Sequence, residues 1–141
     1  MSAIKRWPAD IILSNCIRER SNWTCERCER YYPEGHRGGL EHSHYWGRAI
    51  KATRWCAENG TALCTGCHAY FTGRPEEHVV WMRTKLGEGM LEILREKQRE
   101  LYRGWRRDLK DIRSHYSHEY VLLQVQRNEG VQGRIEFASW N

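Results

Sequence analysis

Apolar residues recur at the three- and four-residue spacing of helices in several stretches of the chain. A short helix is predicted to begin near Pro8 and to cover Ala9–Arg20, because charged residues separate its apolar positions. A second helix is predicted over Glu76–Leu86, and a long, highly charged helix from Met90 to about Ser114. The apolar stripe of the long helix consists of Leu91, Leu94, Leu101, Trp105, Leu109 and Ile112.

Strand patterns occupy the middle of the chain. Leu40–Trp46 alternates between apolar and polar residues and ends at Gly47, which predicts a strand, and some strand character is also expected around Ala52–Trp55. The segment Ala62–Phe71 opens with Cys64 and is expected to become helical after it. With both helices and strands expected, we predict a fold of the α+β class.

The ends of these elements define the predicted organisation of the chain. Pro33–Leu40 is rich in glycine and polar residues and is predicted to be a loop. Tyr120–Gln126 and Arg134–Trp140 alternate on either side of turn residues, which predicts a C-terminal β-hairpin. We expect a core region over residues 1–90, followed by a helical extension with this hairpin over residues 91–141.

Composition and charge narrow the class of protein. The chain has 141 residues and a formal net charge of +5, which favours a polyanionic partner such as nucleic acid. It contains no run of 18 apolar residues, so we expect no membrane span. Met1–Asp10 lacks the apolar core of a secretory signal, so a cytoplasmic location is expected. In that reducing compartment, six cysteines are more often metal ligands or buried thiols than disulfides.

Four of the cysteines form two Cys-x-x-Cys pairs, Cys25 with Cys28 and Cys64 with Cys67. Each pair can present two thiolates to one cation, and four thiolates complete a tetrahedral Zn²⁺ site. Such a site has no open position, so the zinc is expected to be structural. Disulfides, a thioredoxin-like motif and an iron–sulfur cluster are the alternatives, although a redox pair normally stands alone near a βαβ pattern.

The segment between the two cysteine pairs contains His44 and Asn59, and His68 directly follows the last cysteine. In this order and spacing, the three residues resemble the signature of the HNH nuclease family. The likeness is closest to HNH proteins of tailed phages and prophages, and the layout is related to that of NinG-type recombination endonucleases. The motifs that carry the resemblance are Arg18–Arg20, Trp23–Cys28, Ser43–Arg48 and Ala62–His68.

The resemblance implies a ββα-metal fold in which the first strand carries a general base, a loop carries the asparagine and a helix carries the last histidine. It implies that His44 is the base, that His68 binds the catalytic divalent ion and that Arg48 contacts the scissile phosphate. The chemistry agrees, because an imidazole titrates near neutrality and can take a proton from water. Asn59 can accept from the other ring nitrogen of the base or hold the loop.

The sequence departs from the common HNH pattern at one position. Many family members have Asp or His just before the base, whereas this chain has Ser43, a weak metal ligand. His42 is the nearest substitute, and His78 or Glu41 could also contribute. Mg²⁺ prefers oxygen ligands, so a histidine-rich site favours Mn²⁺, Ni²⁺ or Zn²⁺ in its place.

Basic residues around the motif are candidates for binding DNA phosphates. The long helix is a further candidate: it could lie along a duplex or pair with a second copy, although glutamates interleave with its bases. The basic residues beside the motif are Arg27, Arg30, Arg37, Lys51 and Arg54. The basic residues on the predicted long helix are Arg95, Lys97, Arg99, Arg103, Arg106, Arg107 and Lys110.

The function expected from these features is a metal-dependent DNA endonuclease that nicks or cuts DNA in phage recombination, repair or packaging. Two alternatives stay open. The first is a non-catalytic zinc module that binds DNA or a phage protein, which the weak ligand Ser43 leaves possible. The charged helix and the terminal segment are compatible with a structural partner in a larger assembly, or with a homodimer.

Overall fold

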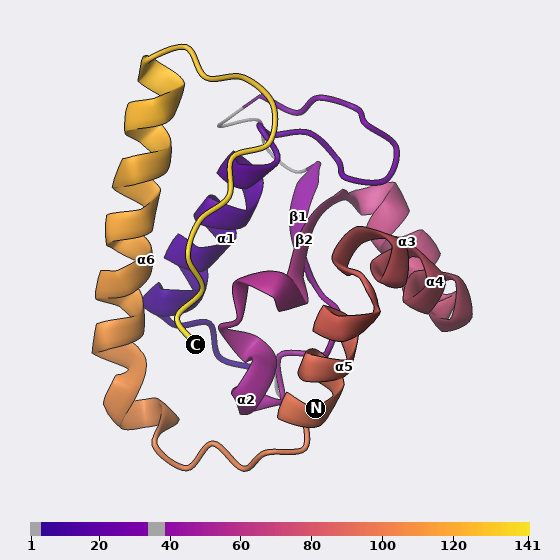
Figure 1. The fold of residues 1–141 in the computed structure, drawn as a ribbon, viewed down its shortest axis with the longest axis vertical. Coiled ribbons are helices and arrows are strands. Elements are labelled where there is room, and N and C mark those ends of the chain that lie inside the picture. Colours follow the sequence, from indigo (N-terminus) through magenta and orange to yellow (C-terminus); the bar gives the residue numbers. More distant parts are fainter. Residues whose placement is uncertain (1–3, 34–38) are drawn as a thin grey trace.

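The computed structural model describes residues 4–33 and 39–141, so Arg37 and most of the predicted loop Pro33–Leu40 lie outside the described residues. The described part is α+β, with helices arranged around one antiparallel pair of strands (Figure 1). Among these residues, no helix combines the length and apolar character needed to cross a membrane. The elements are α1 (Pro8–Arg20), β1 (Leu40–His44), α2 (Lys51–Arg54), η1 (Ala57–Asn59), β2 (Gly60–Cys64), α3 (Thr65–Thr72), α4 (Pro75–Leu86), α5 (Glu88–Lys97) and α6 (Trp105–Asn128).

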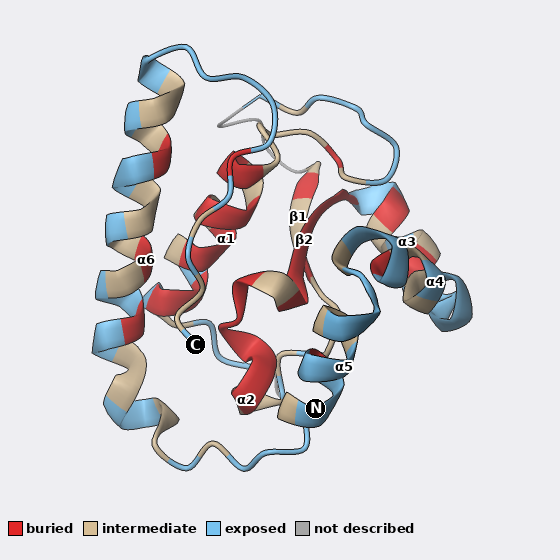
Figure 2. Ribbon diagram, viewed as in Figure 1, coloured by how far each residue is buried: buried red, intermediate tan, exposed pale blue. Residues whose placement is uncertain are grey.

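The main core lies between α1, the sheet and α6, which runs alongside α1 (Figures 1 and 2). Leu13 and Ile17 of α1 are buried together with Ile112, Tyr116 and Leu123 of α6. The α6 residues are four and seven positions apart, so they share one face of the helix. The core therefore includes side chains from both predicted regions, residues 1–90 and 91–141.

The two strands form a short ladder with α3 directly after it. β1 pairs with β2 in antiparallel register, with Leu40 opposite Cys64 at one end and His44 opposite Gly60 at the other. All five residues of β2 are buried, because helices cover the sheet. The predicted strand over Leu40–Trp46 is confirmed, although it ends at His44.

The predicted C-terminal β-hairpin is wrong. Tyr120–Gln126 lies inside α6, and Arg134–Trp140 forms no strand within the described residues. The alternation that suggested a strand places Leu123 in the core while Val121 and Val125 are exposed on the outer face of the helix. Packing of α6 against α1 thus overrides the strand preference of these β-branched residues.

Two further predictions are corrected. The long helix predicted from Met90 to about Ser114 is two helices, because residues 98–104 separate α5 from α6. Ala52–Trp55, for which strand character was expected, mostly belongs to the short helix α2. The helix predicted over Glu76–Leu86 is confirmed as α4. Gly87 joins it to α5 with a φ of +84°, a conformation that favours glycine.

The last residues, 131–141, form an extended segment that crosses back over α1, and we refer to it as the C-terminal strap (Figure 1). Its Ile135 amide donates to the carbonyl of Arg20 at 3.0 Å, and its Ser139 hydroxyl accepts from the Ala57 amide at 3.0 Å. Its Trp140 amide donates to the Tyr116 hydroxyl at 2.9 Å. The strap therefore joins α1, η1 and α6.

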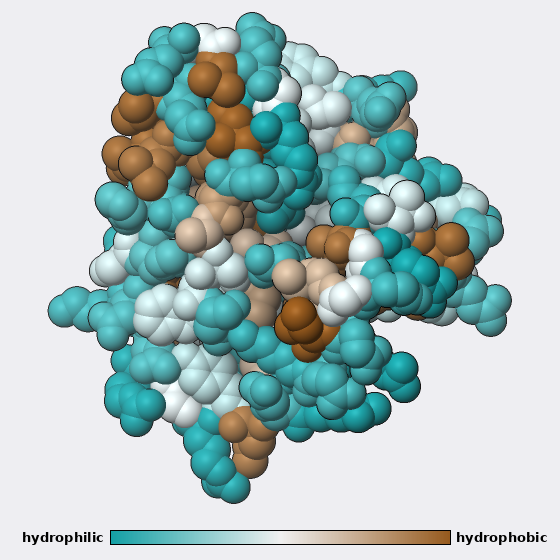
Figure 3. Space-filling model, in the orientation of Figure 1, coloured by the Kyte–Doolittle hydropathy of each residue, from teal (hydrophilic) through white to brown (hydrophobic). Residues whose placement is uncertain are grey.

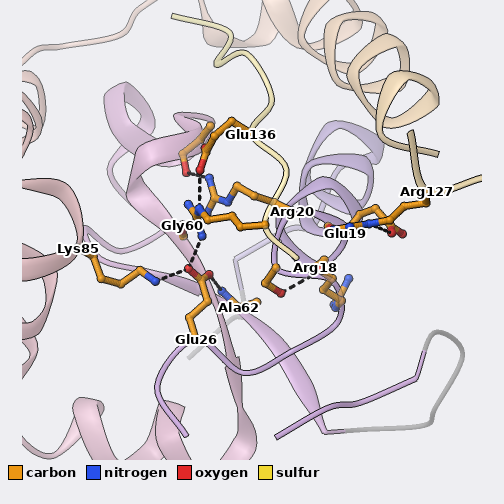
Figure 4. A network of polar contacts seen from close by, with 12 residues as sticks. Arg18, Glu19, Arg20, Glu26, Gly60, Ala62, Lys85, Arg127 and Glu136 are labelled. Atoms are coloured by element: carbon orange, nitrogen blue, oxygen red, sulfur yellow. Dashed lines mark hydrogen bonds and ion pairs between the residues drawn. The ribbon is translucent and has the colours of Figure 1, made fainter. Parts of the chain in front are cut away.

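A polar network connects the end of α1 to the turn before β2 (Figure 4). The buried Arg20 guanidinium donates to the carbonyls of Ala57 at 3.0 Å and Gly60 at 2.6 Å. Glu26 accepts from the Ala62 amide at 2.6 Å and forms an ion pair with Lys85 at 2.7 Å. The two Arg20 bonds hold both ends of η1, the turn that carries Asn59, and Glu26 ties β2 to α4.

A second buried ion pair joins α1 to α2. Arg54 donates to both carboxylate oxygens of Asp10, from Nε at 2.9 Å and from Nη2 at 2.8 Å, and their side chains are only 1% and 4% exposed. Arg54 Nη2 also donates to the carbonyl of Lys5 at 2.7 Å. This bidentate geometry compensates two charges that would otherwise be costly to bury.

Asp10→Ala is expected to lower the free energy of unfolding by about 3–5 kcal/mol, because it leaves the Arg54 charge buried without its partner. Urea unfolding followed by circular dichroism measures the change. The matched control is Glu96→Ala, which removes an exposed pair with Arg99 and should cost less than about 0.5 kcal/mol. Equal losses in the two variants would contradict a structural role for the buried pair.

Candidate functional site

The four cysteines of the two Cys-x-x-Cys pairs meet in space, as predicted. Their Sγ atoms all lie within 4.8 Å of one another. Cys25 and Cys28 come from the turn after α1, Cys64 from the end of β2, and Cys67 from the first turn of α3. All six cysteines of the chain are free thiols, so the cluster is not a pair of disulfides.

The geometry of this cluster fits a metal ion such as zinc. Tetrahedral zinc with bonds of about 2.3 Å requires sulfur atoms about 3.8 Å apart, and the Sγ atoms of Cys28 and Cys64 are 3.8 Å apart. Donors also point at the sulfurs: the Cys64 amide lies 3.3 Å from Cys25 Sγ, and Arg27 Nη1 lies 3.4 Å from Cys67 Sγ. Such donors stabilise thiolates, which are the form that binds zinc.

His44, the predicted base, is the last residue of β1 and is partly buried. Its ring stacks on that of His42, with the ring centroids 4.0 Å apart. Burial, together with the nearby positive charge of Arg48, lowers the pKa of His44 to about 4. The imidazole is therefore neutral at physiological pH, with a lone pair available to accept a proton.

His42 lies beneath His44 on the same face of β1, as strand alternation requires. Its Nδ1 is hydrogen-bonded to the Ser14 hydroxyl at 2.9 Å, and its Nε2 is buried without a hydrogen-bond partner. The ring packs so closely on Gly60 that a side chain at that position would collide with it. Burial, reinforced by His44, lowers the pKa of His42 well below its usual value. Its role as a metal ligand stays a prediction.

Asn59 is completely buried and holds the chain that follows His44. Its Oδ1 accepts from the Trp46 amide at 2.8 Å, and its Nδ2 donates to the Trp46 carbonyl at 2.9 Å. Its own carbonyl accepts from the Tyr45 amide at 2.8 Å. Of the two roles considered from the sequence, the structure therefore gives Asn59 that of holding the loop.

His68 lies on α3 and contacts Glu41, which the sequence had suggested only as a further contributor. His68 Nδ1 is 2.8 Å from Glu41 Oε1, and both side chains are partly exposed. A carboxylate can only accept, so Nδ1 donates, and in a neutral imidazole the lone pair lies on Nε2. Glu41 alternates with His42 and His44 along β1, so its side chain leaves the strand on the other face. His68 nevertheless lies near His44, because its charge contributes to the lowered pKa of His44.

His78, another suggested contributor, lies on α4 beside the same face. Its ring stacks on Phe71 with centroids 4.6 Å apart, and it meets Tyr45 edge-on at 5.2 Å. Its Nε2 is buried without a partner. Burial, and then the charge of His68, lowers the pKa of His78.

The structure thus brings together some of the predicted site residues and not others. His42 and His44 are in contact, Asn59 braces the loop behind them, and His68 pairs with Glu41. Within residues 4–33 and 39–141, the four cysteines are the only group of three or more His, Cys, Asp or Glu side chains close enough to hold one ion. Ser43 is buried in β1, and Arg54, a suggested phosphate contact, is buried against Asp10.

Comparison with protein-family models, with curated proteins and with solved structures gives no match for this chain. The α+β fold and the cysteine cluster therefore rest on the structure itself. The nuclease assignment rests on the motif and the arrangement of the residues around β1.

Replacing Cys64 with serine is expected to remove the bound metal and to destabilise the fold, since one of four thiolates is lost. Elemental analysis of the purified wild-type protein should give about one zinc ion per chain, and the variant should give almost none. Cys56→Ala is the control, because Cys56 is buried outside the cluster and bonds to Ala52. Equal zinc contents in all three proteins would contradict a four-cysteine site.

Asn59→Ala is expected to destabilise the protein, because it leaves the amide and the carbonyl of Trp46 without their partners. Each such buried group costs about 1–3 kcal/mol, which urea unfolding would detect. Asn128→Ala, at the exposed end of α6, should leave stability nearly unchanged. A neutral effect of Asn59→Ala would show that the loop does not depend on this side chain.

Proposed function

We propose that this protein is a zinc-stapled, metal-dependent DNA endonuclease of the HNH class. The observation that carries the proposal is the arrangement at one end of the sheet. Neutral His44 ends β1 opposite Gly60. Asn59, the residue before Gly60, bonds to the backbone that follows His44. The order β1, β2, α3, with His68 on the helix, agrees with the ββα arrangement that the motif implies.

In this proposal His44 is the general base that takes a proton from the attacking water. A base must be unprotonated and held in place before the reaction. The lowered pKa keeps the imidazole neutral over the whole physiological range. The stack on His42, which is itself bonded to Ser14, restricts the ring.

The role of Asn59 is to position the base. It fixes the backbone of Trp46, two residues after His44, through two hydrogen bonds. Arg20 in turn binds the carbonyls on either side of Asn59, so α1 supports the turn from behind. A base held by rigid neighbours needs little reorganisation to reach its productive geometry.

His68 is the proposed ligand of a catalytic divalent ion, and Glu41 orients it. With Nδ1 donating to Glu41, His68 directs its Nε2 lone pair outward, which is the common carboxylate–histidine arrangement behind metal ligands. When bound, the ion neutralises charge on the phosphate and assists the leaving oxygen. A single imidazole favours Mn²⁺ or Ni²⁺ over Mg²⁺.

Arg48 is the proposed contact for the scissile phosphate. It is partly exposed, and its charge acts directly on His44, so it lies near the base. A guanidinium can bind two phosphate oxygens at once and stays charged at any working pH. Base and phosphate contact would then come from one short segment, His44 to Arg48.

His44→Ala is expected to lower the rate of plasmid nicking or cutting by at least about 100-fold in Mn²⁺, Ni²⁺ or Mg²⁺, because the general base is lost. The measurement is conversion of supercoiled DNA over time, with EDTA as the metal-free reference. His118→Ala, a histidine exposed on α6, is the matched control and should cut at the wild-type rate. Zinc content and circular dichroism should be the same in all three proteins.

Cleavage by His44→Ala at the wild-type rate would show that His44 is not the general base. Tight DNA binding with no cleavage in any of these metals would instead favour the non-catalytic zinc module, in which Ser43 reflects the loss of a metal ligand.

A further inference from the structure

Many of the basic side chains lie beside a carboxylate of the protein itself. These ion pairs lower the net positive charge that the surrounding surface offers to a partner, although each exposed pair is weak. Those paired with a carboxylate are Arg54, Arg83, Lys85, Arg95, Arg99, Arg107, Arg127 and Arg134. The helix bases Arg95 and Arg99, which the sequence offered as DNA contacts, are among them.

A second group of bases gathers where the chain before α1, the helix α2 and the start of α6 meet, at the lower end of Figure 1. We call this group the basic surface, and it consists of Lys5, Arg6, Lys51 and Arg106. In the part of the chain that the structure describes, none of these four side chains has a carboxylate oxygen within 4.0 Å. Lys5, Arg6 and Arg106 are exposed, and Lys51 is partly so.

Tryptophan rings contact three of these four bases, Lys5, Lys51 and Arg106. Lys51 Nζ and Arg106 Cζ lie 4.9 and 4.5 Å from the ring centroid of Trp105. Lys5 Nζ lies 3.8 Å from that of Trp7. The two rings also contact each other edge-on, with centroids 6.1 Å apart. Cation–π contacts position cations without cancelling their charge, so the side chains stay able to bind an anion.

The basic surface adjoins the candidate active site. Arg54, one turn after Lys51 on α2, bonds to the carbonyl of Lys5, and its charge contributes to the lowered pKa of His44. Arg6 similarly affects His42. Burial, followed by the charges of Arg54 and Arg106, lowers the pKa of Lys51. Like charges held this close repel one another until an anion neutralises them.

We propose that Lys5, Arg6, Lys51 and Arg106 bind the phosphate backbone of duplex DNA beside the strand cleaved at His44. This inference rests on the proposed function, since it takes the nuclease substrate as its ligand. Phosphate contacts fix the position of a duplex without reading its sequence. All four proposed contacts are to phosphates, so binding that tolerates many sequences is expected.

The far end of α6 differs in character. Val121, Leu122 and Val125 are exposed there, and Figure 3 shows a hydrophobic patch over the upper part of this helix. The exposed residues near its start include Arg106, Arg107 and Lys110. DNA binding by α6 is therefore assigned to its first turns only, and not to the whole helix.

The test uses Lys51→Glu/Arg106→Glu in the full chain, in a His44→Ala background so that the probe stays intact. Fluorescence anisotropy measures the Kd for a labelled duplex over a series of salt concentrations. Each phosphate contact contributes about 0.9 to the slope of log Kd against log salt. Loss of two contacts should lower that slope by about two and weaken binding at low salt by at least about 10-fold.

The matched control is Arg95→Glu/Arg99→Glu, which makes the same change in net charge on α5 and in the segment that follows it. It should alter the Kd by less than about twofold, because the two arginines already pair with Glu92 and Glu96. If both double variants weaken binding equally, or neither does, the basic surface is not the DNA site. Lys51→Gln/Arg106→Gln repeats the test should the glutamate variant fail to fold.

The outcome is separable from that of the proposed function. If the wild type cuts DNA but the surface variants bind it normally, this inference fails and the nuclease stands. If the wild type never cuts DNA but the surface variants lose binding, the surface stands and the nuclease fails.

Discussion

The buried polar side chains of α1 organise the connection between the two strands. Asp10 binds Arg54 on α2, Ser14 binds His42 on β1, and Arg20 binds the carbonyls that flank Asn59. Asp10 and Ser14 lie four residues apart and share one face of α1, and Arg20 reaches the turn from the last residue of the helix. Polar groups buried in this way are costly unless every partner is in place, which makes the arrangement specific as well as stable. The candidate site is consequently built on a helix, although its own residues lie largely at strand ends and in loops.

The cluster of four cysteines connects separate segments of the chain at the other end of the sheet. Leu40 pairs with Cys64 there, whereas His44 pairs with Gly60 four residues away. At about 3.4 Å per residue, the two ends of this ladder are about 14 Å apart. A zinc ion held by the four thiolates at that distance would have no direct part in the reaction proposed at His44. Its contribution is to close the turn after α1 onto the β2–α3 junction and so to fix the register of the strands.

The sequence predicted the parts of the fold whose signals are local. Pro8 and the apolar spacing after it predicted α1, and the paired cysteines predicted their own meeting in space. Prediction failed where a partner remote in sequence decides the outcome. Arg54 looked like a surface base because nothing nearby reveals Asp10, 44 residues earlier. Tyr120–Gln126 alternates like a strand, and only packing against α1 makes it helical. The Glu41–His68 contact likewise depends on how α3 returns across β1, which residue spacing does not encode.

If the protein is the nuclease proposed above, its distribution of charge separates most of the DNA binding from the base that carries out the reaction. The surroundings of His44 keep its imidazole neutral, since burial and the charge of Arg48 both disfavour the protonated form. A strongly basic active site would do this too, but it would also bind DNA indiscriminately at the base itself. Here the uncompensated lysines and arginines stand beside the site on Trp7 and Trp105, which contribute apolar surface and no carboxylate. In the proposed nuclease, these side chains would hold the phosphate backbone while His44 remains free to accept a proton.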